Sequence, residues 1–107
     1  MRVYSMVRPK LLSLMPDAMA RAERLGYDGT TLLELTVPPT LSASAGAIVT
    51  KDIKMMSGVF VAFPRSPMAT AYDAWSLNEL SGGRFQLGIG SQIKAHLTRR
   101  FGMDFQP

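Results

Sequence analysis

The sequence of 107 residues contains no cysteine and a single histidine, His96. Without cysteine, disulfide bridges, thiolate metal sites and cysteine nucleophiles are excluded, and one histidine excludes a metal centre built from several imidazoles of this chain. No apolar run approaches the ~20 residues of a membrane span, and the N-terminal residues MRVYSMVRPK lack the apolar core of a signal peptide. We therefore expect no metal site, no membrane partner and a cytoplasmic location.

The charge of the chain is mildly basic, with 12 Lys and Arg residues against 8 Asp and Glu residues and a net charge of +4. The basic residues are scattered except in KAHLTRR, residues 94–100, and no aromatic side chain alternates with that run as a nucleic-acid stacking surface requires. We expect a solvated basic face or a site for a small anionic molecule, and no nucleic-acid partner. The hydrophobic fraction of 47% fits one globular domain or a part of one.

Apolar segments typical of strands alternate with helical patterns along the chain. We expect strands at residues 3–7, 30–35, 53–63 and 85–89, and helices at residues 13–25, 41–50, 66–81 and 92–101. The run IKMMSGVFVAF at residues 53–63 is typical of a strand buried on both faces of a parallel sheet. The alternation predicts an α/β fold of about four right-handed βα units, either in an open doubly wound sheet or in a TIM-type (β/α)8 barrel.

Particular residues are expected to end the helices or to fill the core. Gly26 follows the first helix, Ser66 precedes the third as its N-cap, and Gly82–Gly83 ends that third helix. The apolar spacing within the third helix predicts a buried stripe. That stripe comprises Met68, Ala71, Tyr72, Trp75 and Leu80, and we expect Met55 and Met56 to pack in the core as well.

The stretch FPRSPMATAYDAWSLNELSGGRFQLGIGSQIKAHLTRRFG, residues 63–102, resembles the luciferase-like monooxygenase superfamily, and within it the deazaflavin (coenzyme F-420)-dependent oxidoreductases. The segments AERLGYDGTTLLE, KMMSGVFVAF and SGGRFQLGIGS fit the same pattern in the same order. The resemblance selects the TIM-type barrel over the open sheet. Because a whole barrel needs about 250 residues, it implies that residues 1–107 form only the N-terminal half, a partial domain.

The resemblance also implies a reaction and a cofactor. It implies an oxidoreductase that transfers hydride between a small organic substrate and coenzyme F-420, with FMN as the alternative cofactor. The ring would lie across the C-terminal ends of the strands, where the βα loops of a barrel converge.

Two residues are candidates for catalysis. Glu34, at the end of the second strand, matches a position that in the family faces the cofactor ring, where a carboxylate orients substrate or passes a proton. The alternative is an ordinary solvated loop glutamate. His96 is a possible catalytic acid, although a single histidine without a visible partner is more often structural or exposed.

The remaining candidates are expected to bind the cofactor. Ser57–Gly58 aligns with the place where deazaflavin-dependent relatives carry a non-proline cis peptide, while a simple β-bulge is the alternative from the residues alone. Arg65 follows the third strand and could contact an anionic group of the cofactor.

The end of the fourth strand adds further candidates. Gly88, Gly90 and Ser91 close that strand, and a side chain at Gly90 would push into the ring or a phosphate. A dinucleotide fingerprint is not completed, because Ile93 stands where its third glycine would be. Lys94 belongs to the basic stretch, which either meets a phosphate or carboxylate or forms a salt-bridged surface helix.

Half a barrel would leave two strand edges unpaired, so we expect either a homo-oligomer or a missing C-terminal half that covers them. Two other functions stay open. The chain could be a non-catalytic half-barrel that oligomerises or holds a cofactor, or a small phosphate-binding βα protein.

Overall fold

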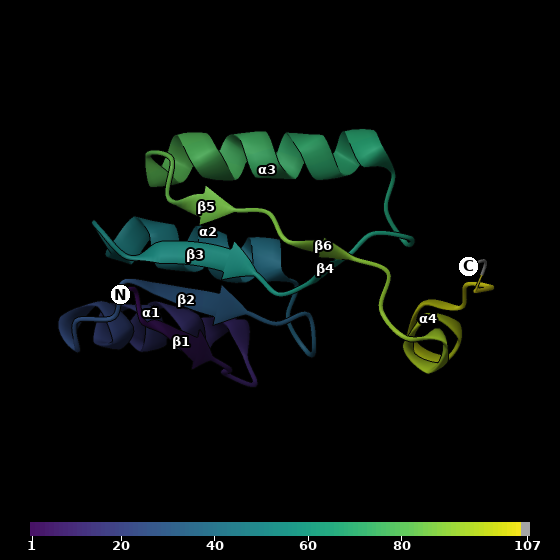
Figure 1. Cartoon of the computed structure of the whole chain (residues 1–107), viewed down its shortest axis with the longest axis horizontal. Helices are drawn as coiled ribbons and strands as arrows, with labels where there is room; N and C mark the ends of the chain where they lie inside the picture. Colours follow the sequence, from purple (N-terminus) through teal and green to yellow (C-terminus); the bar gives the residue numbers. More distant parts are fainter. Residues whose placement is uncertain (106–107) are drawn as a thin grey trace.

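A computed structural model of the chain describes residues 1–105 (Figure 1). The strands are β1 (Tyr4–Val7), β2 (Gly29–Leu32), β3 (Lys54–Ser57), β4 (Phe60–Val61), β5 (Phe85–Gln86) and β6 (Ile89–Gly90). The helices are α1 (Met15–Arg24), α2 (Pro39–Val49), α3 (Pro67–Ser81) and α4 (Lys94–Phe101), with a 3-10 turn, η1 (Leu12–Leu14), before α1. The predicted alternation of strands and helices is confirmed.

All strand pairs in the structure are parallel. One sheet has the order β1-β2-β3-β5, and a second, two-stranded sheet pairs β4 with β6. Since β4 follows β3 and β6 follows β5, the short pair prolongs the neighbouring strands β3 and β5 after an interruption (Figure 1). The carboxyl ends of the strands therefore point the same way and end on one edge.

The hydrophobic core lies between the sheet and the helices α1, α2 and α3. Its largest members come from both layers: Met15, Met19, Leu32, Ile53, Met55, Leu77 and Phe85. In Figure 1, α1 and α2 lie behind the sheet and α3 lies beyond β5, while no helix of residues 1–105 covers the face turned to the viewer. Val7 and Phe85 pack at the core, so their neighbours Met6 and Gln86 point to the opposite face, where both are exposed.

The ends of the helices follow the sequence. The Ser66 hydroxyl accepts a hydrogen bond of 3.1 Å from the Ala69 N–H, which confirms Ser66 as the N-cap of α3. Gly82 ends α3 in the left-handed conformation, with φ of 63°, and Gly26 follows α1 with φ of 85°. The fourth helix begins at Lys94 and not at the expected residue 92, because Gln92 has a positive φ of 65° and Ile93 is extended.

The long strands predicted at residues 53–63 and 85–89 are each interrupted. The Ser57 hydroxyl donates to the Gly88 carbonyl oxygen (3.0 Å) and accepts from the Gly88 N–H (2.8 Å), so a side chain replaces the strand ladder at the interruption. A cis peptide bond follows between Gly58 and Val59. It lies one bond beyond the Ser57–Gly58 bond at which we expected it.

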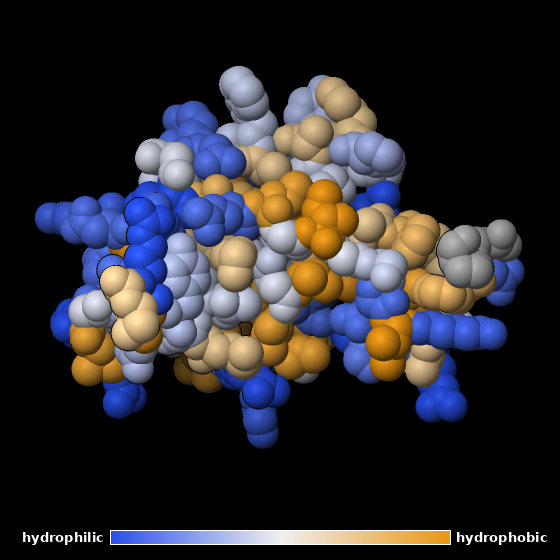
Figure 2. All heavy atoms as spheres, viewed as in Figure 1, coloured by the Kyte–Doolittle hydropathy of each residue, from blue (hydrophilic) through white to orange (hydrophobic). Residues whose placement is uncertain are grey.

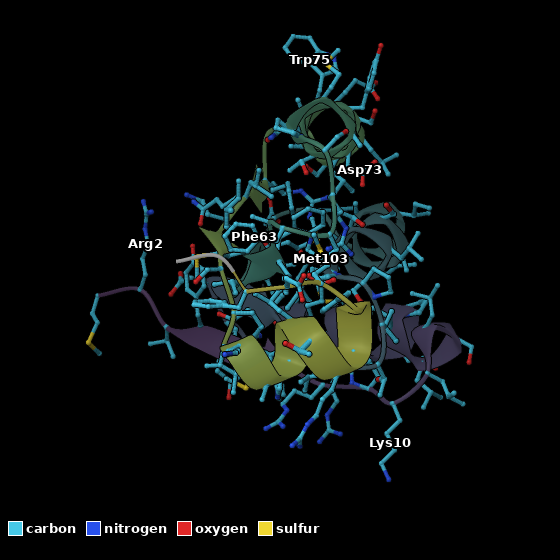
Figure 3. All side chains as sticks on the ribbon, turned by 90° about the vertical axis from the view of Figure 1, so that its right-hand side faces the viewer. Arg2, Lys10, Phe63, Asp73, Trp75 and Met103 are labelled. Atoms are coloured by element: carbon cyan, nitrogen blue, oxygen red, sulfur yellow. The ribbon has the colours of Figure 1, made fainter. Side chains whose placement is uncertain are left out.

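The predicted buried stripe of α3 is wrong. Met68, Tyr72 and Trp75 are exposed, Trp75 by 80%, and so are Ala71 and Leu80. The face of α3 that packs against the molecule carries Thr70, Leu77 and Ser81 instead. This face of α3 packs against α2 and β5, and Trp75 points away from the body of the molecule (Figure 3). Of the two methionines expected in the core, Met55 is fully buried and Met56 is half-buried.

Two charged side chains hold the end of the sheet at which the strands begin. The Arg84 guanidinium donates to the carbonyl oxygens of Ala47, Thr50 and Ile53 at 3.0 to 3.1 Å, which joins the end of α2 to the start of β3. The Glu23 carboxylate accepts from the backbone N–H groups of residues 51, 52 and 53. The turn between α2 and β3 is therefore held from two sides.

None of the helices within residues 1–105 combines the length and the apolar character needed to cross a membrane.

Candidate functional site at the carboxyl ends of the strands

The central feature at this end of the sheet is an ion pair between buried Glu34 and half-buried Arg65. Glu34 follows β2 and its side chain is 5% exposed, while Arg65 follows β4 and its side chain is 24% exposed. Arg65 Nη2 lies 2.6 Å from Glu34 Oε1, and the Val61 N–H donates to Glu34 Oε2 at 2.6 Å. Both carboxylate oxygens therefore have partners, so Glu34 is not the solvated loop residue of the alternative interpretation.

Arg65 is held by three contacts. Besides the ion pair, its Nη1 donates to the Val61 carbonyl oxygen at 3.0 Å, and its guanidinium lies 4.1 Å from the centre of the Phe60 ring. A guanidinium stacked on an aromatic face and paired with a carboxylate has little freedom to move. The pair fixes the loop after β4 against the end of β2.

Helix α4 reaches the same place. Arg100 donates to the Leu35 carbonyl oxygen, and its other terminal nitrogen lies 3.5 Å from the Glu34 carbonyl oxygen. His96 lies one turn earlier on α4, is half-buried, and has an Nδ1 atom that is buried without a hydrogen-bond partner. A buried ring nitrogen without a partner is unusual, since buried polar atoms are normally hydrogen-bonded.

The glycines of the fourth strand have a packing reason within the chain. A Cβ atom on Gly88 would lie 2.1 Å from the Ser57 carbonyl oxygen, and one on Gly90 would lie 2.8 Å from a methyl group of Val59. Neither position leaves room for a side chain, because the neighbouring strand approaches too closely. Their part in cofactor binding stays a prediction.

The remaining predicted residues lie at the same end of the sheet but outside the ion pair. Gly58 is half-buried, and a Cβ there would meet a Thr31 methyl group at 2.6 Å. Ser91 and Lys94 are exposed in the segment that leads into α4. The structure thus joins Glu34 to Arg65 directly and leaves Ser91 and Lys94 on the surface.

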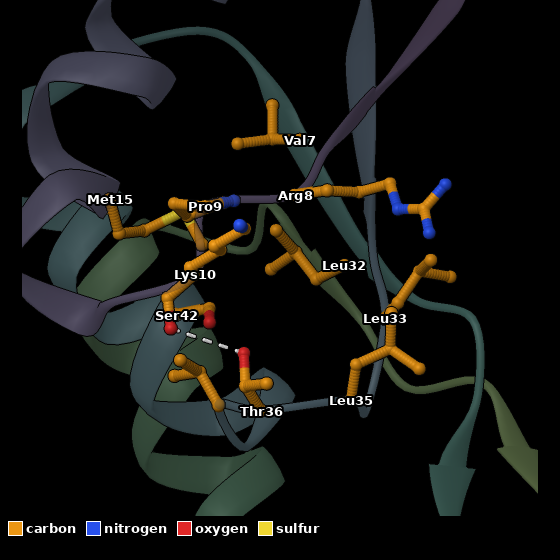
Figure 4. A pocket seen from close by; sticks show the side chains of 11 residues that line it. Val7, Arg8, Pro9, Lys10, Met15, Leu32, Leu33, Leu35, Thr36 and Ser42 are labelled. Carbon is orange, nitrogen blue, oxygen red and sulfur yellow. Dashed lines mark hydrogen bonds between the residues drawn. The ribbon is translucent and has the colours of Figure 1, made fainter.

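A separate hollow of about 330 Å³ lies between the loops that follow β1 and β2 (Figure 4). Buried Met15 and Leu32 line it, and Arg8 and Lys10 supply positive charge. The Thr36 hydroxyl donates to the Lys10 carbonyl oxygen at 3.2 Å and ties the two loops together. Sequence reasoning missed this hollow, although the pair of basic residues directly after the first strand was a signal that could have found it.

The fold and the position of the site together define an α/β protein whose polar groups gather where its parallel strands end. The family model of the luciferase-like monooxygenases matches residues 8–107. The chain therefore belongs to the luciferase-like monooxygenase family. The match spans the β2 end, the Glu34–Arg65 pair and α4.

Curated relatives support this assignment. Uncharacterised proteins of Mycobacterium bovis and of two strains of Mycobacterium tuberculosis are each 37% identical over 95 residues, which is 89% of this chain and 28% of theirs. The chain thus spans somewhat more than a quarter of the length of these relatives.

Solved structures share the fold. The oxygenating constituent of 3,6-diketocamphane monooxygenase from Pseudomonas putida, solved with FMN, matches with a TM-score of 0.84 and 20% identity over 97% of this chain and 33% of its own. The coenzyme F420-dependent tetrahydromethanopterin reductase of Methanopyrus kandleri matches with a TM-score of 0.81 and 22% identity over 96% of this chain and 30% of its own. A monooxygenase of Streptomyces bottropensis gives a TM-score of 0.83 at 16% identity, over 97% of this chain and 37% of its own. The predicted partial barrel architecture is confirmed.

Proposed function

We propose that the chain forms part of an oxidoreductase that holds a flavin-type cofactor, coenzyme F-420 or FMN, across the carboxyl ends of its strands. The observation that carries the proposal is that parallel strands end together beside a buried Glu34–Arg65 pair in a chain of the luciferase-like family. Loops at the carboxyl ends of such strands are where barrel enzymes place their chemistry. Of the matched structures, one contains FMN and another depends on F420.

The exposed side chains at this edge suit a planar ring with an anionic tail. Phe63, two residues after β4, and Ile89, in β6, are exposed apolar residues. Figure 2 shows apolar side chains gathered in the middle of the face turned to the viewer. Lys94 and Arg99 are exposed on α4 beyond them. An apolar surface suits the ring, and the cations suit phosphate or carboxylate groups. When bound, such a cofactor supplies hydride transfer to or from a substrate carbon.

We propose different roles for the two candidate catalytic residues, Glu34 and His96. Each oxygen of Glu34 accepts a hydrogen bond from the chain itself, so we assign its carboxylate to holding Arg65 and Val61 in position. His96, half-buried on α4, is our candidate for the proton donor. We assign the cofactor contacts to Ser57, Gly58, Arg65, Gly88, Gly90, Ser91 and Lys94.

Cofactor binding can be measured directly with the purified chain. We expect saturable quenching of the fluorescence of oxidised F-420 or of FMN, and weaker binding of riboflavin, which lacks the phosphate. Lys94→Gln should weaken binding of the phosphorylated cofactor severalfold, whereas Lys51→Gln, at the opposite edge of the sheet, should not. If neither cofactor binds, the proposal is wrong.

A non-catalytic role is the second candidate, and the uncovered sheet face favours it. That face and the unpaired outer strands β1 and β5 are surfaces that a second copy of the chain can bury, so we propose a homo-oligomer. Cofactor binding without turnover, together with a sedimentation coefficient above that of a monomer, would favour this alternative over the enzyme.

A further inference from the structure

The hollow between the β1 and β2 loops has the features of a small-molecule site. Its volume of about 330 Å³ lies at the lower end of the range of ligand pockets, roughly 300 to 1,000 Å³. Met15 and Leu32 are 2% and 1% exposed and form an apolar floor, and the buried Ser42 adds one hydroxyl to the wall. Apolar floors with few polar groups are typical of sites that bind small organic molecules.

The charge around the hollow has one sign. Arg8 and Lys10 belong to its lining, and none of its eleven lining residues is acidic. The nearest acidic residue along the chain, Glu34, turns its carboxylate to Arg65 and Val61 instead. Within residues 1–105 neither Arg8 nor Lys10 has an acidic partner within 4.0 Å. The two cations are therefore available to an anion.

Hydrogen bonds hold the backbone of the two loops that form the walls of the hollow. The hydrogen bond from Thr36 to the Lys10 carbonyl oxygen joins the two loops (Figure 4), and Arg100 holds the Leu35 carbonyl oxygen from the side of α4. Lys10 extends outwards at the rim (Figure 3), where its flexible stem can follow a ligand. A preformed site loses less conformational entropy on binding.

We propose that this hollow binds a small carboxylate with an apolar body, with the hydrocarbon against Met15 and Leu32 and the carboxylate in the positive field of Lys10 and Arg8. Apolar burial contributes affinity in proportion to the area removed from water. Charge-assisted hydrogen bonds to a guanidinium or an ammonium group orient the anionic end. The proposal does not depend on the cofactor.

Octanoate, 1-octanol and octylammonium separate the contributions of charge and of hydrocarbon, and calorimetric titration of the full chain measures them. We expect octanoate to bind at least tenfold more tightly than 1-octanol, and octylammonium not to bind. Arg8→Gln and Lys10→Gln should each weaken octanoate binding about fivefold to tenfold. Lys51→Gln, an exposed lysine outside the hollow, is the matched control and should leave it unchanged.

The position of the ligand is tested with methyl-labelled methionine. Octanoate should shift the NMR signal of the Met15 methyl group and leave that of the exposed Met68 on α3 unchanged. Equal affinity for octanoate and 1-octanol, unchanged affinity in both charge variants, or no shift at Met15 would each overturn the proposal. Octanoate that fails to bind both with and without added F-420 or FMN would also overturn the proposal.

Discussion

At the scale of single residues, the ion pair between Glu34 and Arg65 joins the loops that form the candidate site. Glu34 is a carboxylate with two satisfied oxygens, and its partner Arg65 is stacked on Phe60. A buried ion pair adds little net stability compared with apolar residues, but removing one partner leaves the other charge unpaired. The pair therefore specifies how the loop after β4 meets the end of β2.

Replacing Glu34 by glutamine tests this role. Glu34→Gln keeps the size of the side chain and one acceptor for the Val61 N–H, but it leaves the Arg65 guanidinium without its counter-charge. We expect the free energy of unfolding, measured in urea, to fall by about 2 kcal/mol. Glu79→Gln, at an exposed position of α3, should change it by less than about 0.5 kcal/mol. Equal effects of the two variants would contradict the assigned role.

Glu23 lies at the end of the sheet where the strands begin, and it gives a prediction about how the stability of the fold depends on pH in acid. Burial raises the pKa of its carboxyl group, but hydrogen bonds from the N–H groups of residues 52, 53 and 51 and the nearby Arg84 charge outweigh that effect, so the pKa lies below its ordinary value. A lowered pKa in the folded state means that the stabilisation is present above the ordinary carboxyl pKa and is lost as the pH falls through the lowered one.

Glu23→Gln should therefore flatten the dependence of stability on pH in the acid range, below the ordinary carboxyl pKa, while Glu79→Gln retains the dependence of the unmodified chain. The measurement is the urea midpoint at a series of pH values between neutrality and pH 3. A Glu23→Gln protein whose acid limb matches that of the unmodified chain would rule out this linkage.

At the scale of elements, the sequence predicted the order and type of the segments better than the faces they bury. Parallel strands have near-continuous apolar runs, so residues 53–63 were recognisable as strand, but the side-chain bridge from Ser57 to Gly88 that divides them depends on a neighbour 31 residues away. In α3 the set with Trp75 and the set Thr70, Leu77 and Ser81 both recur at helical spacing. Periodicity alone predicted that the set with Trp75 is buried, whereas in the structure the set with Leu77 packs against the core.

Paired substitutions in α3 test which face is buried. Trp75→Ser should change the free energy of unfolding by less than about 0.5 kcal/mol, because the side chain is exposed. Leu77→Ala removes a core side chain and should cost about 3 kcal/mol. The opposite ranking in urea unfolding would show that the predicted stripe, and not the observed one, faces the core.

The close approach of the segment after β5 to the end of β3 gives a prediction for the glycines. Gly88→Ala places a methyl group against the Ser57 carbonyl oxygen and should destabilise the chain by about 3 kcal/mol or prevent its folding. Gly82→Asn is the matched control, since it has open space around it and asparagine tolerates the left-handed conformation. Thermal unfolding of both proteins measures the difference, and a fully tolerated Gly88→Ala would disprove the packing explanation.

At the scale of the whole molecule, the two ends of the parallel strands carry different kinds of side chain. The edge where strands begin is closed by Arg84 and Glu23, whose hydrogen bonds join α2 to β3. The edge where strands end carries the Glu34–Arg65 pair, exposed apolar residues and the basic helix α4. The family could be predicted from the sequence, because residues 63–102 keep its pattern. The ion pair was not predicted, because it joins residues 31 positions apart.

Hydrogen exchange of the chain with and without F-420 or FMN tests the cofactor assignment most directly. We predict that the cofactor slows amide exchange in residues 57–61 and 88–94, at the carboxyl ends of the strands, and leaves residues 50–54 at the opposite edge unchanged. Protection confined to residues 50–54, or saturable binding without protection at the carboxyl ends, would contradict the account.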